Sequence, residues 1–532
     1  MSRAKTGTFL HHGDPPPTHR INLSLPPSTR YLALAREYKS QLLDITSLFD
    51  DLVLSFLPES YLPKIKWLAR RFLRRVYDNE ENEEIKGIAE ATGIEMYLVV
   101  ALNVLLDLLM GCTSGAALSS PSSHSREGEE PRMLHFRTLE WDMSPLRALL
   151  VNLEFVADDD PDSSVLATSI TYVGFVGVLT GVRRGLSVSL NFRPNHDDSS
   201  WIKQSRFYGG HVAVLLGLRR SISSVLRGLL IPRPATGIGQ NTAPGNDEEE
   251  EGNQKGRGYL NYLCRFWRTS KPTTQAHALP LDQTVARITR TPSTACYIIL
   301  SDGRKTTVLE KDRSARSTKT YSSTSFIVVT NSDREMEAAL AKNTPKQGPS
   351  TSTSMSMASS RQEHTAALIT PDDRISMLDL IGDSKERREC MQSKWDKKVD
   401  AARRRRAKNP AVTDPLGRTR LARVRMPTPT AAAMQRQGSV SGSSSSLDVQ
   451  TLTSLPVPVL PGYRGREREQ KPAPEPEPEP IVTITPEELI AWTTTYPTTN
   501  EMTHFAAVMD PVAGGVLWAR VYSEPLDCAG LD

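Results

Sequence analysis

The sequence changes character at residue 112. From about residue 31 to 110, apolar residues recur at the three-to-four-residue spacing of α-helices. After residue 112, short segments rich in β-branched residues alternate with Gly, Pro, Asp and Asn. Helices followed by an antiparallel sheet with further packed helices predict an α+β fold.

The helical region before residue 112 contains two amphipathic patterns separated by Pro58 and Pro63. The first has apolar residues at helical spacing, namely Leu42, Ile45, Leu48, Phe49, Leu52, Val53 and Phe56. The second, "KIKWLARRFLRRVY", has a basic stripe of Lys66, Arg70 and Arg74 opposite Ile65, Leu68, Phe72 and Val76. This pattern is typical of an ordinary helix with a solvated outer face. It also suits a helix that lies on an anionic membrane surface.

A third segment, "IEMYLVVALNVLLDLLM" (94 to 110), resembles a membrane-spanning helix in its hydropathy. It is slightly short for a span and contains Asn103 and Asp107, which are costly at bilayer depth. We therefore expect a buried or interfacial helix.

The expected strands follow residue 112. They are "MLHFRTLEW", "LLVNLEFVA", "SSVLATSITYVGFVGVLTG", "GLSVSLNFR", "ACYIILSD", "KTTVLEK" and "TSFIVVTNSD". Near the end, "THFAAVMD" and "GVLWARVY" flank "PVAGG", which predicts a hairpin. The segment "GGHVAVLLGLRRSISSVLRGLL" is typical of helix.

Low-complexity sequence divides these regions. Residues 1–20 are expected to be a flexible terminus, 119–131 a Ser-rich loop and 232–258 a surface insertion. Residues 337–482 contain "STSTSMSMASS" and "PAPEPEPEP", so most of this stretch is expected to be disordered. Arg403 to Arg406 could contact nucleic acid, but the net charge of only +4 makes a nucleic-acid partner unfavoured for the chain as a whole.

The five cysteines are widely spaced and form no CxxC pair, so we expect neither a disulfide framework nor a metal or cofactor site. The first twenty residues have no apolar core of a secretory signal. Both features predict a cytoplasmic or membrane-associated protein.

Several segments in order resemble one family. They are "INLSLPPSTRY" (21 to 31), "NEEIKGIAEATGIEM" (82 to 96), "GCTS" (111 to 114), "LLVNLEF" (149 to 155), "YVGFVGVLTGVRRGLSVSLNFR" (172 to 193) and "VVTNSDR" (328 to 334). Together they resemble acid ceramidase and the related N-acylethanolamine-hydrolysing acid amidase.

The resemblance implies an N-terminal-nucleophile hydrolase with an αββα sandwich. Such a precursor cuts itself before a cysteine, and the two fragments stay associated. In this chain the helical α-subunit would be residues 21–111. The β-subunit would comprise 112–336 and 483–532, with a short matching segment near 370–384 inside the long insertion. The family works in lysosomes or vacuoles, so analogy favours that compartment instead.

The placement of Cys112 suits this chemistry. Breaking the bond between Gly111 and Cys112 would free an α-amine with an ordinary pKa of about 7.7 to 8.0, which is suitable for a general base. That amine could take the thiol proton and so activate the nucleophile. Without the family resemblance, Cys112 would be interpreted as a small buried apolar residue.

Further site residues follow from the resemblance alone. Arg137 in "HFRTLEW" matches an arginine near the nucleophile, and Asn331 in "VVTNSDR" matches an oxyanion donor. The family's aspartate that contacts the new amine falls on Glu140, with Asp142 as the second candidate. Arg374 in "TPDDRIS" resembles the arginine of a "DDR" motif.

Three functions are compatible with these features. The first is hydrolysis of N-acyl lipids, with ceramide converted to a sphingoid base and a fatty acid. The second is hydrolysis of N-acylethanolamines or other acyl amides, because pocket shape decides specificity. The third is a catalytically weak scaffold that keeps the fold and recruits a partner through its long insertion.

Overall fold

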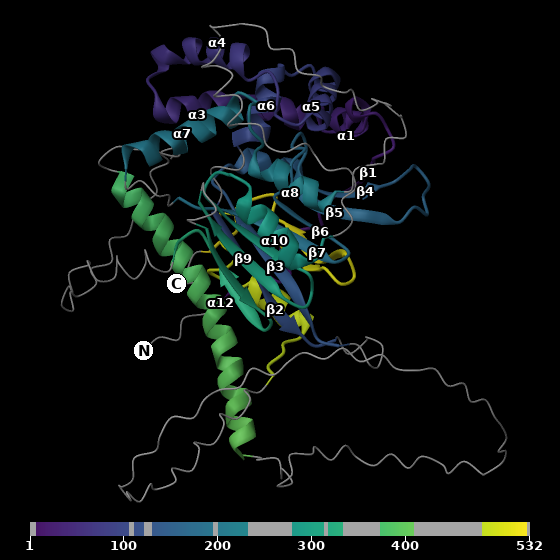
Figure 1. The fold of residues 1–532 in the computed structure, drawn as a ribbon, viewed down its shortest axis with the longest axis vertical. Helices are drawn as coiled ribbons and strands as arrows, with labels where there is room; N and C mark the ends of the chain where they lie inside the picture. The colour runs from purple at the N-terminus through teal and green to yellow at the C-terminus, as the bar shows by residue number, and fades with distance from the viewer. Residues whose placement is uncertain are drawn as a thin grey trace, which may run out of the picture. The chain divides into compact units, whose positions relative to one another are not determined.

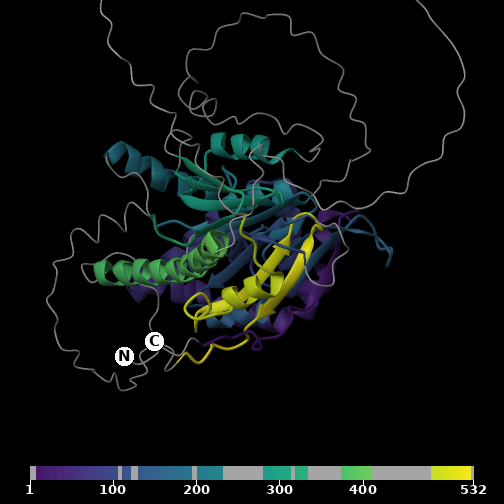
Figure 2. The ribbon, with the colours of Figure 1, turned by 90° about the horizontal axis from the view of Figure 1, so that it is seen from below.

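Two β-sheets form the centre of the protein (Figures 1 and 2). The computed structural model describes residues 7–105, 111–121, 130–194, 200–231, 279–312, 318–333, 373–408 and 481–528. The larger sheet has eight strands in the described residues. In spatial order they are β1 (Thr18–Asn22), β4 (Leu150–Val156), β5 (Val165–Tyr172), β6 (Thr180–Arg183), β7 (Leu186–Phe192), β8 (Cys296–Ser301), β9 (Thr306–Lys311) and β10 (Lys319–Ser323).

The smaller sheet brings together strands that are far apart in the sequence. Its spatial order is β11 (Phe326–Val329), β2 (Gly111–Ser119), β3 (Arg132–Glu140), β12 (Thr503–Asp510) and β13 (Gly515–Val521). The predicted hairpin at "PVAGG" is confirmed, because β12 and β13 pair antiparallel on either side of it. The long segment between β11 and β12 therefore interrupts one sheet of the core.

The two sheets pack face to face through alternate residues of their strands, as the two-residue period of a strand requires. From β3, His135 reaches across to Ser187 and Ser189 of β7 at 2.8 and 2.9 Å. Burial lowers the pKa of His135 to about 3, so the ring is neutral between the sheets.

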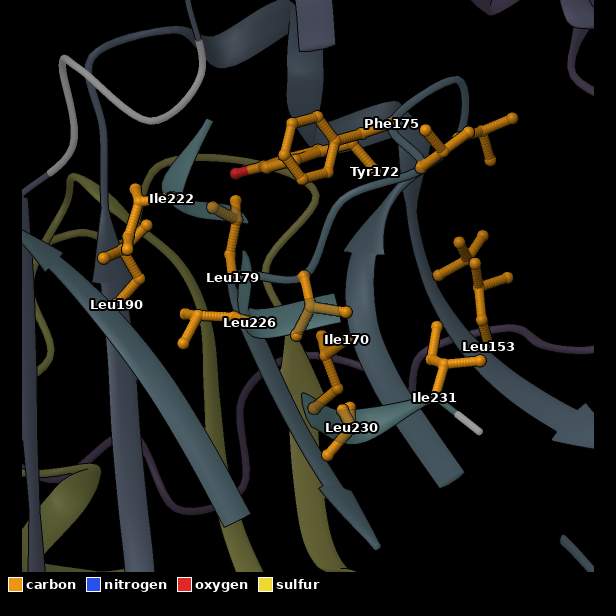
Figure 3. Packing of buried hydrophobic residues seen from close by; sticks show 14 of the residues in the cluster. Leu153, Ile170, Tyr172, Phe175, Leu179, Leu190, Ile222, Leu226, Leu230 and Ile231 are labelled. Atoms are coloured by element: carbon orange, nitrogen blue, oxygen red, sulfur yellow. The ribbon is translucent and has the colours of Figure 1, made fainter. Parts of the chain in front are cut away.

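Helices cover both outer faces. On the larger sheet, α8 (Ile222–Leu230) packs against β6 and β7, and α10 (Leu281–Arg290) packs against β8 and β9. Figure 3 shows Leu226 and Leu230 of α8 among the buried side chains of this sheet. On the smaller sheet, α13 (Pro486–Thr493) and α12 (Asp373–Lys408) supply Leu489 and Trp395 to a second core. The expected αββα arrangement is therefore confirmed.

The N-terminal region is helical, as predicted. Its helices are α1 (Leu32–Glu37), α2 (Lys39–Asp44), α3 (Leu48–Phe56), α4 (Leu62–Phe72), α5 (Asn79–Thr92) and α6 (Met96–Leu105). In α6, the Asn103 side chain donates to the Val99 and Gly174 carbonyls and accepts from the Val176 amide, so burial leaves it satisfied. The helix is thus buried, as expected, and no helix among the described residues is long and apolar enough to cross a membrane.

The N-terminal region is also joined to the larger sheet. β1 pairs in parallel with β4, a contact that the short sequence "THRIN" did not predict. Nearby, the buried Glu84 carboxylate of α5 lies 3.0 Å from Arg30 and 2.7 Å from Arg227 of α8. The guanidinium groups oppose the effect of burial, although burial still leaves the pKa of Glu84 raised.

The helix α12 was not expected within residues 337–482, although a short matching segment near 370–384 was. Residues 373–408 form one helix, and a single stripe of its side chains is buried: Ser384, Arg387, Met391 and Trp395. Their spacing is that of one helix face, and the low-complexity sequence on either side concealed it. The expected insertion 232–258, most of the loop 119–131, and residues 334–372 and 409–480 lie outside the described residues.

Candidate active site

Cys112 is the second residue of β2 and is completely buried. It pairs in register with Leu139 of β3, while Gly111 pairs with Glu140. A β-carbon at Gly111 would lie 3.1 Å from the Glu140 carbonyl oxygen, so the close approach of these strands favours glycine immediately before the cysteine.

Hydrogen bonds to a side chain and to a main-chain carbonyl hold Cys112 in place. Its backbone N–H donates to Asn331 Oδ1 at 2.6 Å, and its thiol donates to the Leu190 carbonyl at 3.7 Å. Burial raises the pKa of the thiol to about 11, although the nearby Arg137 and Arg387 act in the opposite direction. The sulfur of the intact chain is therefore protonated at neutral pH and needs a base to become a nucleophile.

Asn331 lies just after β11 and is held on three sides. Its Nδ2 donates to the Phe192 carbonyl at 2.8 Å, and its backbone N–H donates to Ser384 Oγ at 2.8 Å. Its Oδ1 accepts from the Cys112 backbone. The predicted oxyanion donor is thus beside the predicted nucleophile, and in the intact chain its amide group is engaged by Phe192.

Arg137 of β3 lies on the same face of the smaller sheet as Cys112, toward the larger sheet. Its Nη1 donates to Ser114 Oγ at 3.0 Å and to Asn191 Oδ1. Asn191, at the end of β7, also donates to the Val329 and Thr330 carbonyls. Its position within "SLNFR" was the only sequence signal for this residue. Within the described residues, Nε and Nη2 of Arg137 have no hydrogen-bond partner despite being buried.

The two candidate carboxylates have different environments. Glu140 is buried, and burial raises its pKa, while Arg387 and Arg137 oppose that effect. One of its oxygens lies 3.9 Å from Arg387 Nε. Asp142 is exposed. The structure thus brings Glu140, and not Asp142, to the buried region around Cys112.

The arginine supplied by α12 is Arg387. Its Nε donates to Thr113 Oγ1 at 3.2 Å and its Nη2 donates to Asn331 Oδ1 at 3.3 Å. Arg374, the arginine expected from the "DDR" resemblance, lies in the first turn of the same helix, and its side chain is outside the described residues. Arg387 is thirteen positions further along the helix than Arg374, which is about 20 Å along the axis. Sequence reasoning missed Arg387, although "KERREC" carries an arginine pair.

An apolar cavity of about 90 Å³ lies in the helical region near this site. Trp141, which directly follows Glu140, forms part of its wall. The other lining residues come mainly from α2, α3, α5 and α6 and include Leu42, Phe49, Leu52, Ile88, Leu98 and Leu102. Apart from the Thr46 hydroxyl and the indole N–H of Trp141, the lining side chains are apolar, so the cavity suits a hydrocarbon group.

A metal site is not evident in the part of the chain that the structure describes. There, no three His, Cys, Asp or Glu side chains are grouped so that they could hold a metal ion.

Comparisons with known proteins find similarity to N-acylethanolamine-hydrolyzing acid amidases and acid ceramidases. The family model for the beta subunit of N-acylethanolamine-hydrolyzing acid amidase matches residues 14–77. The N-acylethanolamine-hydrolyzing acid amidase of Caenorhabditis elegans is 30% identical over 193 residues, which are 34% of this chain and 49% of that protein. The acid ceramidase of Mus musculus is 29% identical over 194 residues, which are 34% of this chain and 46% of that protein.

The chain therefore spans about half the length of the curated relatives it matches. A solved structure of the C. elegans amidase ortholog covers 43% of this chain and 73% of its own, with 18% identity and a TM-score of 0.26, too low to add to the fold assignment. The sequence matches confirm the resemblance found in the motifs: part of the chain is similar to acid ceramidases and N-acylethanolamine-hydrolyzing acid amidases.

Proposed function

We propose that this protein hydrolyses the amide bond of N-acyl lipids, with Cys112 as an N-terminal nucleophile exposed by cleavage after Gly111. The observation that carries the proposal is the 2.6 Å hydrogen bond from the Cys112 backbone nitrogen to Asn331 Oδ1. That nitrogen would become the free amine. It already lies in a buried site with an arginine, a carboxylate and an amide side chain.

The proposed cleavage begins when Cys112 Sγ attacks the Gly111 carbonyl carbon. The bond to the Cys112 nitrogen breaks, that nitrogen takes up a proton, and a thioester forms. Water then hydrolyses the thioester, which leaves a carboxylate on Gly111 and restores the thiol. This step needs no co-reactant except water. It would explain why a glycine and a buried cysteine meet at the start of a strand.

In the cut enzyme, the free α-amine would take the proton of the Cys112 thiol, and the thiolate would attack the substrate carbonyl. Arg137 and Arg387 would stabilise negative charge near the sulfur, and Asn331 would donate to the oxyanion. Amide donors of that kind contribute typically about 2.7 to 4 kcal/mol. Glu140 would hold the protonated amine. Although its side chain is longer than the aspartate that the resemblance implies at this position, it still supplies a buried carboxylate, which weighs against a catalytically weak scaffold.

The apolar cavity supports an N-acyl substrate, because hydrocarbon is the group that its lining would accept. Our proposed substrate is ceramide, which would give a sphingoid base and a fatty acid. The second candidate is an N-acylethanolamine. It is favoured by the family model and by the C. elegans relative, both of which are described as acting on that class.

Contact with a membrane surface forms part of the proposal, since such substrates reside in bilayers. Several apolar side chains of the helical region are exposed instead of packed, including Tyr61, Trp67, Leu68 and Phe72 of the α4 region. The helix α7 (Trp201–Leu215), which contacts α6, exposes Trp201. Two residues of the predicted basic stripe are engaged in ion pairs, Lys66 with Asp50 and Arg70 with Glu95. The exposed aromatic side chains therefore support membrane contact more strongly than the basic stripe does.

The cut fragments would stay together because of the contacts between the N-terminal region and the larger sheet. The pairing of β1 with β4 and the contact between Glu84 and Arg227 both join residues on opposite sides of the proposed cut.

The test is hydrolysis of a panel of ceramides and N-acylethanolamines by purified protein, with N-terminal sequencing of its fragments. We expect one fragment to begin at Cys112 and fatty acid to be released. A purified, folded protein that is cut at Cys112 but releases no fatty acid from any panel member would contradict the proposed substrate class. An uncut protein that hydrolyses the panel would contradict the proposed nucleophile.

A further inference from the structure

A buried ion pair joins the two sheets beside the candidate site. Arg193 directly follows β7 of the larger sheet, and Asp333 lies in the segment after β11 of the smaller sheet. Arg193 Nε donates to Asp333 Oδ1 at 2.9 Å and Nη2 donates to Oδ2 at 2.6 Å. Tyr297 of β8 donates its hydroxyl to the same carboxylate, and all three residues are buried.

Both members of the ion pair lie close in sequence to the residues that hold Asn331 beside Cys112. Arg193 follows Phe192, whose carbonyl accepts the Asn331 amide. Asp333 is two residues beyond Asn331 itself. The ion pair therefore spans the same gap between β7 and the post-β11 segment as the Asn331 hydrogen bond.

A bidentate pair fixes both the separation and the relative plane of the two groups, because two parallel hydrogen bonds must be satisfied together. The third hydrogen bond from Tyr297 restricts the carboxylate further. Arg193 Nη1 also donates to the Lys311 carbonyl at 3.2 Å, which ties the guanidinium to β9. These hydrogen bonds fix the Arg193 and Asp333 side chains, and so they restrict the main chain at Phe192 and Asn331.

We propose that Arg193, Asp333 and Tyr297 are positioning residues for Asn331. They set the distance between Phe192 and Asn331, and so the orientation in which the carboxamide faces Cys112. The inference rests on the proposed function, in which Asn331 stabilises the oxyanion. None of the three needs to touch the substrate.

A buried ion pair is by itself weak evidence for net stability, and breaking one leaves an uncompensated charge. The test must therefore separate positioning from general destabilisation. The matched control is Asp510, which is buried at the end of β12 and pairs with Arg132 at 3.0 Å, at the opposite end of β3 from Glu140. Asp510→Asn removes a comparable buried charge far from Cys112.

The variants are Asp333→Asn, Tyr297→Phe and the Asp510→Asn control. Because a misplacement of 1 Å can reduce a rate by about a hundredfold, we expect Asp333→Asn to lower kcat by about tenfold or more. KM should stay within about twofold, because substrate contacts are unchanged. Tyr297→Phe keeps the ion pair, so it should fold normally and lower kcat by a smaller factor. Asp510→Asn should lower the melting temperature only.

A second measurement does not depend on the substrate. The rate at which iodoacetamide alkylates Cys112, followed by peptide mass spectrometry as a function of pH, should change in Asp333→Asn and Tyr297→Phe but not in Asp510→Asn. An Asn331→Ala background should abolish the further effect of Asp333→Asn, since coupled residues are non-additive.

Equal kcat and equal alkylation profiles in Tyr297→Phe, folded Asp333→Asn and the wild type would overturn the positioning role. So would additive effects of Asp333→Asn and Asn331→Ala. If the wild type hydrolyses no N-acyl amide, the proposed function fails, and the alkylation profiles alone decide on the positioning residues.

Discussion

The guanidinium of Arg387 lies 3.9 Å from the carboxylate of Glu140, although a helix from the long insertion carries the first and a central strand carries the second. The same guanidinium donates to Asn331 Oδ1. One side chain of α12 thus connects Glu140 with Asn331, which accepts a hydrogen bond from the Cys112 nitrogen.

Arg387→Gln should slow both chain cleavage and substrate hydrolysis. A hydrogen bond to a charged group contributes about 1.5 to 3 kcal/mol, which corresponds to roughly 10- to 100-fold in rate. The control is Arg374→Gln in the first turn of the same helix, which should leave both rates unchanged. Gel analysis of cleavage over time and a fatty-acid release assay measure the two rates. If Arg374→Gln slowed both rates and Arg387→Gln slowed neither, Arg374 would be the arginine that acts at the site.

Cys112→Ala should leave a single uncut chain, because the attacking sulfur is gone. Cys112→Ser keeps a weaker oxygen nucleophile and should be cut very slowly or not at all. Cys296→Ala, a change at a second buried cysteine, should be cut like the wild type. If the alanine variant still yields a fragment that begins at residue 112, an external protease makes the cut.

Replacing residues 409–480 with a short flexible linker should leave folding and activity nearly unchanged, since loop length adds slowly to closure entropy. A larger deletion of 385–480 should fail. It removes Arg387 from the site and Met391 and Trp395 from the second core, where Trp395 stacks on Phe326 with ring centroids 5.0 Å apart. Thermal unfolding compares the two proteins. Equal melting temperatures would show that α12 contributes nothing to the core.

Glu81 gives a prediction for stability against pH. Burial raises the pKa of Glu81 from 4.5 to about 7, so the folded protein binds its proton more tightly than the unfolded chain does. This contribution to stability is fully present below pH 4.5 and is lost as pH rises to about 7. Glu81→Gln keeps an acceptor for Ser224, and it should raise the free energy of unfolding above pH 7 by roughly 3 kcal/mol. Denaturant unfolding of both proteins across pH measures the difference, which should vanish at acidic pH.

Trp67→Ser combined with Phe72→Ser should weaken sedimentation with liposomes, because these exposed aromatic side chains would enter the interface. Leu517→Ser, at an exposed apolar position on β13, is the control. Arg71→Gln with Arg74→Gln should reduce binding only to liposomes with anionic lipid, and added salt should do the same to the wild type. Equal binding of all four proteins would mean that this face is an ordinary solvated surface.

The sequence predicted those features that depend on local pattern. The helices before residue 105, the strands from Met133 onward other than β10, and the terminal hairpin follow from periodicity and turn residues. Cys112, Arg137 and Asn331 could be singled out because they lie in short segments that resemble motifs of one family. The structure brings all three together.

Other features depend on contacts that pattern does not encode. Arg387 was missed because the insertion separates it from Asn331, so spacing along the chain said nothing about distance. The strand β1 is too short for a periodicity signal and exists through its pairing with β4. Glu84 looks like one of many surface charges in "NEENEEIKG", and only the fold reveals that Arg30 and Arg227 surround it.

The pairing of β1 with β4 affects how the protein can fold before and after the proposed cut. Before a cut at Gly111, this strand finds its neighbour within one molecule, so folding is unimolecular. After the cut, any excursion to the unfolded state would let two chains diffuse apart, and recovery would depend on their concentration. The cut protein would then remain folded because it unfolds slowly. The single uncut chain would be needed only once, for the first folding.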